Sequence, residues 1–223
     1  IGNSIAGGEF WEPFLQPIFD CVKAGDVVVD VGANLGWFTI YAARRGAYVY
    51  AFEPCPEVFG LLKRNVEQNS LAHQVSLIPL ALYSRCESMV ASELGPENPA
   101  HQVFVGGGID TNQCTSSGSF ALKEGVVGVA RQYAIALDSL HLNPNLIKVD
   151  AEGLDLEVMQ GAVETIRRCQ PTLCYEYLGP NPEEEPGRLA AFNTFIADIG
   201  YEAREIHRGM EGHYLEFVAQ RRG

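Results

Sequence analysis

Residues 27–38 read VVVDVGANLGWF, an apolar run that ends in a glycine-spaced turn. The run 27–31 is apolar on both faces, as is typical of a central strand in a parallel sheet. A glycine turn between a strand and a helix brings free backbone N–H groups and the positive end of a helix dipole to a ligand. The stretch therefore predicts a strand–turn–helix unit that binds a nucleotide-like cofactor.

The spacing within this turn is Asp30-x-Gly32-x-Asn34-x-Gly36. The dinucleotide fingerprint Gly-x-Gly-x-x-Gly is not matched, because Asn34 stands where a second glycine is needed, and no Gly-Lys-Ser/Thr of a P-loop is present. A carboxylate two residues before the first glycine would repel a diphosphate and attract a cation. S-adenosylmethionine carries a sulfonium and an amino group but no phosphate, so the turn favours it over a dinucleotide.

Glu53 gives a second cofactor signal. It ends the expected strand 47–52 and lies 23 residues after Asp30. An acid at about this distance typically accepts both hydroxyls of a ribose.

Outside this unit, strand patterns alternate with helical spacing, which predicts a mostly parallel α/β sheet with helices on both faces. The expected strands are 27–31, 47–52, 74–80, 146–149, 172–177, 201–206 and 214–220, and the expected helices are 9–23, 36–45, 56–68, 153–168 and 187–199. The last two strands are too close for a crossover helix and must form an antiparallel hairpin. We expect a single domain, 1–223, with a helical segment at 1–24 and an irregular loop or lid at 84–131.

Four segments carry a resemblance to a known family. They are residues 25–36 (GDVVVDVGANLG), 51–54 (AFEP), 137–140 (LDSL) and 147–162 (IKVDAEGLDLEVMQGA). In these the chain resembles the FkbM-type methyltransferases. The resemblance implies a Rossmann-like class I methyltransferase fold with a seven-stranded sheet, S-adenosylmethionine as donor, and usually an oxygen acceptor.

The resemblance also implies site residues. Asp30, Gly32, Asn34 and Gly36 match the first cofactor motif, Glu53 matches the ribose acid, and Ala81 follows the third strand, where the family flanks the adenine. Glu12 matches an acid that the family places before the first strand, whereas Leu80 departs from the polar residue often found before the alanine. The expected cofactor-binding set is Asp30, Gly32, Ala33, Asn34, Gly36, Phe38, Glu53, Pro54, Ala81 and Asp150.

Asp150 and Glu152 are the expected catalytic residues. Asp150 comes at the end of the strand 146–149, where ligands of open parallel sheets bind, and an extended backbone would point both carboxylates the same way. A carboxylate pair can position a hydroxyl and take its proton, and mutual repulsion raises one pKa. Two other interpretations stay open: Asp150, Glu152 and Glu176 hold a divalent metal ion, or Glu152 caps the following helix.

Bulk composition restricts the partners. The chain has 223 residues, 47% of them hydrophobic, and 28 acids against 16 bases give a net charge of -12. Such an acidic chain is a poor partner for nucleic acid, and no basic amphipathic helix or long apolar run indicates a membrane. Six cysteines without metal or Cys-x-x-Cys spacing favour a reducing cytoplasm.

These observations predict an S-adenosylmethionine-dependent O-methyltransferase that acts on a small-molecule or saccharide hydroxyl. The alternatives are an NAD-dependent oxidoreductase and a nucleotide-binding module without catalysis.

Overall fold

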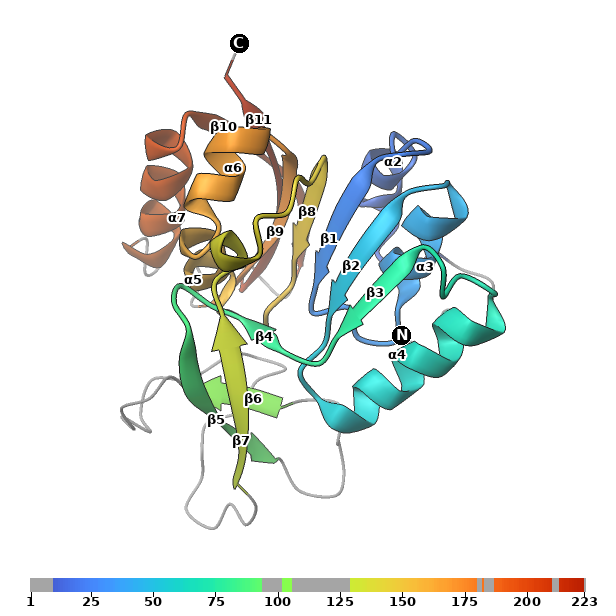
Figure 1. Ribbon diagram of the computed structural model, residues 1–223. Coiled ribbons are helices and arrows are strands. Elements are labelled where there is room, and N and C mark those ends of the chain that lie inside the picture. The colour runs from blue at the N-terminus through green and yellow to red at the C-terminus, as the bar shows by residue number, and fades with distance from the viewer. Residues whose placement is uncertain are drawn as a thin grey trace.

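The computed structural model describes residues 10–93, 102–105, 129–179, 182, 187–209 and 213–222. Its centre is a seven-stranded sheet with the order β10-β11-β9-β8-β1-β2-β3 (Figure 1). The strands are β1 (Val27–Val31), β2 (Tyr48–Phe52), β3 (Val75–Ile78), β8 (Leu146–Val149), β9 (Thr172–Leu178), β10 (Tyr201–Gly209) and β11 (Tyr214–Arg221).

The strand β1 is central, as its apolar sequence predicts, and pairs in parallel with both β2 and β8. The strand β11 runs antiparallel to its neighbours β9 and β10, whereas the other neighbouring pairs of this sheet are parallel. The predicted seven-stranded, mostly parallel sheet with a closing hairpin is confirmed. The strand order reverses between β1 and β8, and this is the point at which open α/β sheets bind ligands.

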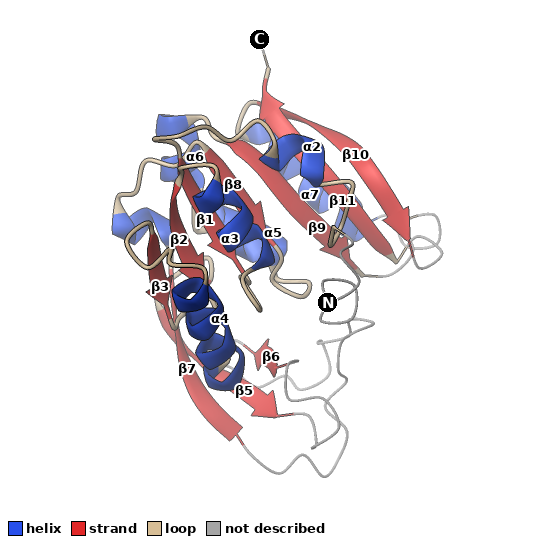
Figure 2. Cartoon of the chain, turned by 90° about the vertical axis from the view of Figure 1, so that its right-hand side faces the viewer, coloured by secondary structure: helices blue, strands red, loops and turns tan. Residues whose placement is uncertain are grey.

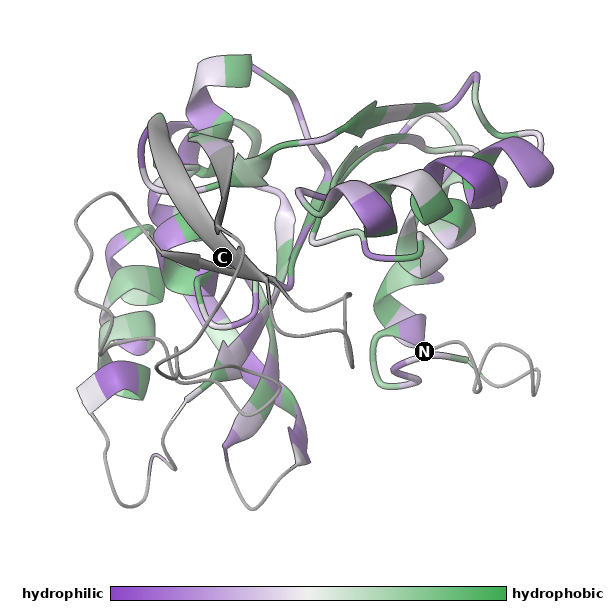
Figure 3. Ribbon diagram, turned by 90° about the horizontal axis from the view of Figure 1, so that it is seen from below, coloured by the Kyte–Doolittle hydropathy of each residue, from purple (hydrophilic) through white to green (hydrophobic). Residues whose placement is uncertain are grey.

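Helices cover both faces of this sheet (Figure 2). They are α2 (Gln16–Phe19), α3 (Trp37–Arg44), α4 (Pro56–Gln68), α5 (Asp155–Gln160), α6 (Val163–Cys169) and α7 (Gly187–Asp198). Residues of α3 and α4 pack into one hydrophobic cluster and residues of α5, α6 and α7 into another, one on each side of the sheet. In α4, Val58, Leu62 and Val66 repeat every four residues and are buried. Figure 3 shows the resulting mixture of hydrophilic and hydrophobic positions along the helices.

The predicted N-terminal helix 9–23 is wrong over most of its described part. Only the single turn α2, Gln16–Phe19, is helical there. Pro13 and Pro17 lack backbone N–H groups, and Glu12 has a left-handed backbone with φ of 51°. The apolar side chains of this segment are nevertheless buried, since Leu15, Phe19 and Val22 pack against the sheet.

The predicted helix 153–168 is split into α5 and α6 at Gly161-Ala162. A Cβ on Gly161 would overlap the backbone carbonyl of Tyr83, so two chain segments cross in close contact here. The side chain of Asp138, in the 3-10 helix Leu137–Leu140, then accepts the backbone N–H groups of Glu164 and Thr165 at 3.0 and 2.7 Å. Asp138 thereby caps α6 from a distant segment.

A second, four-stranded sheet has the order β4-β7-β5-β6. It consists of β4 (Ala81–Leu82), β5 (Glu87–Glu93), β6 (Gln102–Val105) and β7 (Val129–Ile135). Figure 1 shows it below the large sheet, where β3 leads into β4. The prediction of an irregular segment over 84–131 is therefore wrong for these strands, whereas residues 94–101 and 106–128 lie outside the described ones. Short strands between glycine- and proline-rich stretches gave too weak a pattern to detect.

Candidate active site

The turn after β1 is fixed by contacts within the protein. Gly32 has φ of 71°, and a Cβ at this position would overlap the backbone carbonyl oxygen of Asp150. The N–H groups of Gly32 and Ala33 both donate to the carbonyl of Phe52, at 3.0 and 2.9 Å. Gly32 is thus required by the close approach of the turns after β1 and β8.

The rest of the turn leads into α3 through left-handed residues. Asn34 has φ of 50°, and Gly36, the N-cap of α3, has φ of 88°. A Cβ on Gly36 would lie 2.5 Å from Cδ1 of Leu62. The sequence GANLG therefore places glycine and asparagine, the residue types that tolerate a left-handed backbone best, at these positions.

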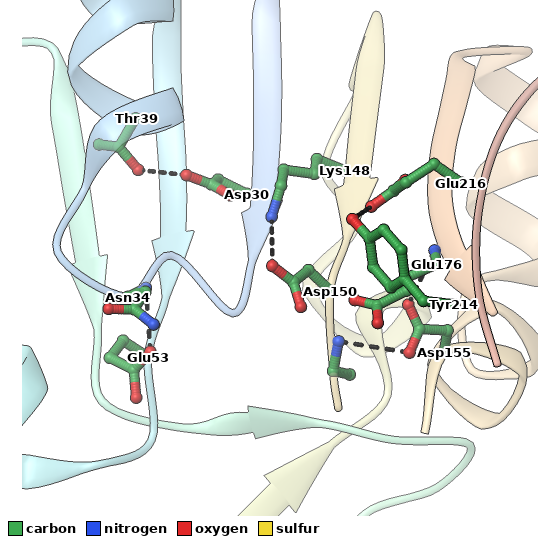
Figure 4. A network of polar contacts seen from close by, with 11 residues as sticks. Asp30, Asn34, Thr39, Glu53, Lys148, Asp150, Asp155, Glu176, Tyr214 and Glu216 are labelled. Carbon is green, nitrogen blue, oxygen red and sulfur yellow. Dashed lines mark hydrogen bonds and ion pairs between the residues drawn. The ribbon is translucent and has the colours of Figure 1, made fainter. Parts of the chain in front are cut away.

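Glu53 is held beside this turn (Figure 4). Its Oε2 accepts the N–H of Asn34 at 3.0 Å, its Oε1 accepts the N–H of Cys55 at 2.9 Å, and the residue is 7% exposed. Burial raises the pKa of Glu53 to about 7, although the two backbone hydrogen bonds oppose that shift. Each carboxylate oxygen keeps acceptor capacity for one further donor. The proximity of Glu53 to the glycine turn agrees with the sequence-based expectation.

Asp30 and Lys148 are buried neighbours on β1 and β8. They are register partners, 1% and 3% exposed. Thr39 Oγ1 donates to Asp30 Oδ2 at 2.5 Å, whereas Asp30 Oδ1 is buried without a hydrogen-bond partner among the described residues. Burial raises the pKa of Asp30. The cation nearest to this acid is therefore a lysine of the protein itself.

Lys148 is the positive charge around which several acids of the site are arranged. Its Nζ lies 3.0 Å from Asp150 Oδ2 and 5.0 Å from the ring centre of Phe38. Burial alone would lower the pKa of Lys148, but the negative charges of Asp150, Asp30 and Glu12 raise it on balance. Sequence reasoning missed this residue, although a lysine inside the otherwise apolar strand LIKV is a recognisable signal.

Glu152 does not continue an extended backbone, which corrects the geometry assumed for it. Its φ is 50° and that of Gly153 is 88°, so the chain turns at Glu152. The residue is exposed, yet its carboxylate is crowded by protein atoms, and this crowding together with the charges of Asp150 and Asp155 raises its pKa to about 7. Both predicted catalytic acids therefore belong to one electrostatic cluster.

Asp155 holds the turn after β8 through hydrogen bonds from backbone N–H groups. It is fully buried, and its two oxygens accept the N–H groups of Ala151 and Glu176 at 3.3 and 3.2 Å. Burial, followed by the charge of Asp150, raises its pKa to about 7. Asp155 thus joins the turn after β8 to β9, a role that the sequence did not reveal.

Three more acids approach from other segments. Glu176 of β9 is 6% exposed and faces Glu216 of β11, which is 3% exposed, across the antiparallel pair. Tyr214 donates its hydroxyl to Glu216 at 3.0 Å. Burial raises the pKa of both Glu176 and Glu216 well above the ordinary value. Burial also raises the pKa of Glu12 to about 7, against the opposing charge of Lys148.

The remaining candidates are placed differently. Phe38 is buried in the first turn of α3, and half-buried Pro54 directly follows Glu53. Ala81 lies in β4, where it is buried against Ala134 in the hydrophobic cluster of the small sheet. No group of three or more His, Cys, Asp or Glu side chains in the described ranges has a geometry suited to a metal ion. No helix in those ranges is both long and apolar enough to cross a membrane.

Comparison with known proteins gives consistent matches. Residues 30–203 match the family model described as methyltransferase FkbM domain. Methyltransferase 1 of Beauveria bassiana is 30% identical over 163 residues, which cover 67% of this chain and 64% of that protein. The hexuronic acid methyltransferase AglP of Haloferax volcanii is 28% identical over 173 residues, which cover 76% and 64%. This chain therefore spans less than two thirds of the length of these two relatives, 64% in each case.

Two further matches are more restricted. The 31-O-demethyl-FK506 methyltransferase FkbM of Streptomyces tacrolimicus is 43% identical over 56 residues, which cover 24% of this chain and 22% of that protein. The crystal structure of a methyltransferase FkbM from Methylobacillus flagellatus superposes with a TM-score of 0.57 at 14% identity, over 88% of this chain and 43% of that chain. At this identity the superposition shows a shared fold.

Proposed function

The chain belongs to the methyltransferase FkbM domain family, and we propose that it transfers a methyl group from S-adenosylmethionine to a hydroxyl oxygen of a small molecule or saccharide. The observation that carries the proposal is the position of Glu53. Its buried carboxylate is fixed by the N–H of Asn34 at 3.0 Å, directly beside the left-handed turn after β1.

The acidic side chains beside the turn fit S-adenosylmethionine better than a dinucleotide. Glu53 offers acceptor capacity on both oxygens for the two ribose hydroxyls. Asp150 supplies negative charge near the sulfonium and the amino group, and Asp30 lies behind it next to Lys148. Lys148, the buried cation beside the turn, is engaged by Asp150 at 3.0 Å, and the carboxylates of Glu53 and Asp150 would repel a diphosphate.

The cofactor-binding residues that we propose act in different ways. Gly32, Ala33, Asn34 and Gly36 shape the turn, and Pro54 follows the ribose acid. Phe38 lies under the ammonium of Lys148, with the ring centre 5.0 Å away, and orients it toward Asp150. Asp30 acts through Thr39 and Lys148 because it is 1% exposed. Ala81, in the small sheet, remains the proposed adenine neighbour.

The acids after β8 account for the remaining chemistry. S-adenosylmethionine supplies a methyl group activated by its sulfonium, which an acceptor oxygen displaces in line. Glu152 takes the proton of the acceptor hydroxyl, since a base with a pKa of about 7 is well matched to neutral pH. Asp150 is held by Lys148 and positions the hydroxyl.

Two relatives support an oxygen acceptor. One is named for a hexuronic acid and the other for an O-demethylated substrate. The two alternatives from the sequence are weaker. A dinucleotide lacks a diphosphate cradle in this turn, and a binding module without catalysis leaves the two neighbouring acids after β8, Asp150 and Glu152, without a role.

Calorimetry with S-adenosylhomocysteine tests the cofactor assignment. Glu53→Ala should weaken binding by roughly 1–3 kcal/mol, or about 5- to 150-fold, because charge-assisted hydrogen bonds are lost. Glu67→Ala is the matched control, because Glu67 lies on the exposed face of α4 and its side chain pairs with exposed Lys63 at 4.0 Å. Unchanged affinity in Glu53→Ala, or tighter binding of NAD than of S-adenosylhomocysteine, would contradict the assignment.

Methyl-labelled S-adenosylmethionine and a panel of hydroxyl compounds test catalysis. Product that carries the label on oxygen supports the proposal. Cofactor binding without transfer to any class of hydroxyl compound favours the binding-module alternative.

A further inference from the structure

The acids of the site lie on two sides of β8. The turn after β1 and Glu53 after β2 lie on one side, and these are the proposed cofactor contacts. Glu176 on β9 and Glu216 on β11 lie on the other side, one and two strands beyond β8. Neighbouring strands are about 4.8 Å apart, so these acids are roughly 5 and 10 Å from β8 in the plane of the sheet. This side is left for the acceptor.

Glu176 differs from the other buried acids in having no partner. Asp155 is fully buried, and two backbone N–H groups donate to its oxygens. Glu176 is 6% exposed, and no hydrogen bond or ion pair from the described residues reaches its carboxylate. Its oxygens are not among the fully enclosed atoms without a partner, so they can accept donors from a ligand that enters the site.

Glu216 completes the arrangement. As register partners in an antiparallel pair, Glu176 and Glu216 project from the same face with Cβ atoms about 5 Å apart. Tyr214 donates to one oxygen of Glu216, at 3.0 Å, and thereby fixes its orientation. Figure 4 shows these side chains at the same end of the sheet as Asp150. Lys148 forms its ion pair with Asp150 and acts on Glu216 only through its charge, without a hydrogen bond to it among the described residues.

Building on the methyl-transfer function proposed above, we propose that Glu176 and Glu216 bind a protonated amine of the acceptor. The acceptor is then an amino alcohol or an amino sugar that is methylated on oxygen. A compact ammonium group offers three donors and one positive charge to two converging carboxylates. An ammonium held in this way has no lone pair, so it cannot itself accept the methyl group. An acceptor with a carboxylate would add a further negative charge to this side and is disfavoured.

Binding is coupled to a proton. Two neighbouring buried carboxylates do not both ionise readily, and burial together with nearby acids raises the pKa of each. Without a bound cation the pair is therefore harder to ionise fully than two exposed carboxylates. An ammonium ion favours the ionised form of both carboxylates, so its binding should release protons to solvent. The charged and titratable groups that act on the pair are Glu12, Lys148, Asp150, Glu152, Asp155 and Tyr214.

Matched probes test the proposal on the protein saturated with S-adenosylhomocysteine. The first series is ethanolamine, ethylene glycol and glycolate, and the second is glucosamine, glucose and glucuronate, with affinities measured by ligand-observed NMR or calorimetry. The amine of each series should bind at least about 10-fold more tightly than its neutral analogue, and the acid most weakly. Calorimetry in two buffers of different ionisation enthalpy should show net proton release when the amine binds.

Glu176→Gln should abolish the amine preference and the proton release while cofactor affinity stays unchanged. Glu202→Gln, on the exposed edge strand β10, is the matched control and should retain both. Undetectable amine binding, equal binding of amine and neutral probes, or a methyl group found on nitrogen overturns the inference. If Glu176→Gln does not fold, the wild-type probe series decides alone. Failure to bind S-adenosylhomocysteine refutes the proposed function, whereas cofactor binding without amine preference refutes only this inference.

Discussion

Lys148→Met should destabilise the protein strongly, because it removes the cation around which the site acids are arranged. Lys148 is 3% exposed and lies 3.0 Å from Asp150. Coulomb's law at an effective dielectric constant of about 20 gives roughly 5 kcal/mol for unit charges at this 3.0 Å separation. Recovered desolvation offsets part of this energy, so the expected loss in the free energy of unfolding is about 3–5 kcal/mol. Methionine keeps a similar length and apolar contact with Phe38.

The expected loss depends on pH. The raised pKa of Lys148 means that its contribution is present below the pKa of an unfolded lysine and is lost as the pH rises through the folded value. At the acid end, Glu12 and Glu152 take up protons around pH 7, which removes the charges that Lys148 balances. The destabilisation should therefore be greatest near about pH 8 and smaller near about pH 5.

Urea denaturation of the wild type and the variant at these two pH values measures the effect. Lys63→Met is the control, because Lys63 forms an exposed pair with Glu67 at 4.0 Å and should change stability by at most about 0.5 kcal/mol. A loss below about 1 kcal/mol in Lys148→Met, or a loss that is equal at both pH values, would refute the role assigned to this lysine.

Three further changes test other parts of the structure. Glu152→Gln should abolish turnover without changing cofactor affinity, and wild-type kcat/KM should rise through about pH 7; normal turnover in the variant would exclude Glu152 as the base. Gly32→Ala should lower the midpoint of urea denaturation, because its Cβ would overlap the carbonyl of Asp150, whereas Gly60→Ala, with no atom within 4 Å, should stabilise by about 0.5–1 kcal/mol. Asp138→Ala should cost about 1–2 kcal/mol in thermal unfolding through loss of the α6 cap; a melting temperature equal to that of wild type would contradict this.

The sequence is sufficient to predict the part of the fold around β1. The apolar strand, the acid, and the glycine spacing all depend on residues that are adjacent in the chain. The place of Glu53 beside the turn follows as well, since it ends the neighbouring parallel strand. Parallel neighbours bring their carboxyl ends to one edge, so no long-range register has to be known.

The two wrongly predicted helices have different causes, one local and one from a distant segment. In residues 10–22 the apolar spacing favours a helix, but Pro13 and Pro17 remove hydrogen bonds that a helix needs. At Gly161 the break between α5 and α6 depends on the backbone of Tyr83, which is far away in sequence. Neither outcome can be obtained from periodicity alone.

The pairing of Glu176 on β9 with Glu216 on β11 was missed for a different reason, although Glu176 itself was considered as a metal ligand. Glu176 and Glu216 become neighbours only through the antiparallel register, in which a shift by one residue would place them on opposite faces. The available signal was an acid inside an otherwise apolar strand, as in YLEFVAQ. Lys148 gives the same signal in LIKV. Charges inside buried strands are thus a useful indicator of site residues in this fold.

These acids weaken the fold unless a cation is bound. Burial raises the pKa of Glu53 from 4.5 to about 7, so between these pH values the folded chain holds more protons than the unfolded chain. The free energy of unfolding therefore falls as the pH rises through this range. Glu176 and Glu216 act in the same direction, and replacement by apolar residues would relieve the penalty. A cationic cofactor and a cationic acceptor offset this loss of stability. Each binds the ionised acids and stabilises the folded state by mass action. Their burial is therefore better explained by ligand binding than by folding.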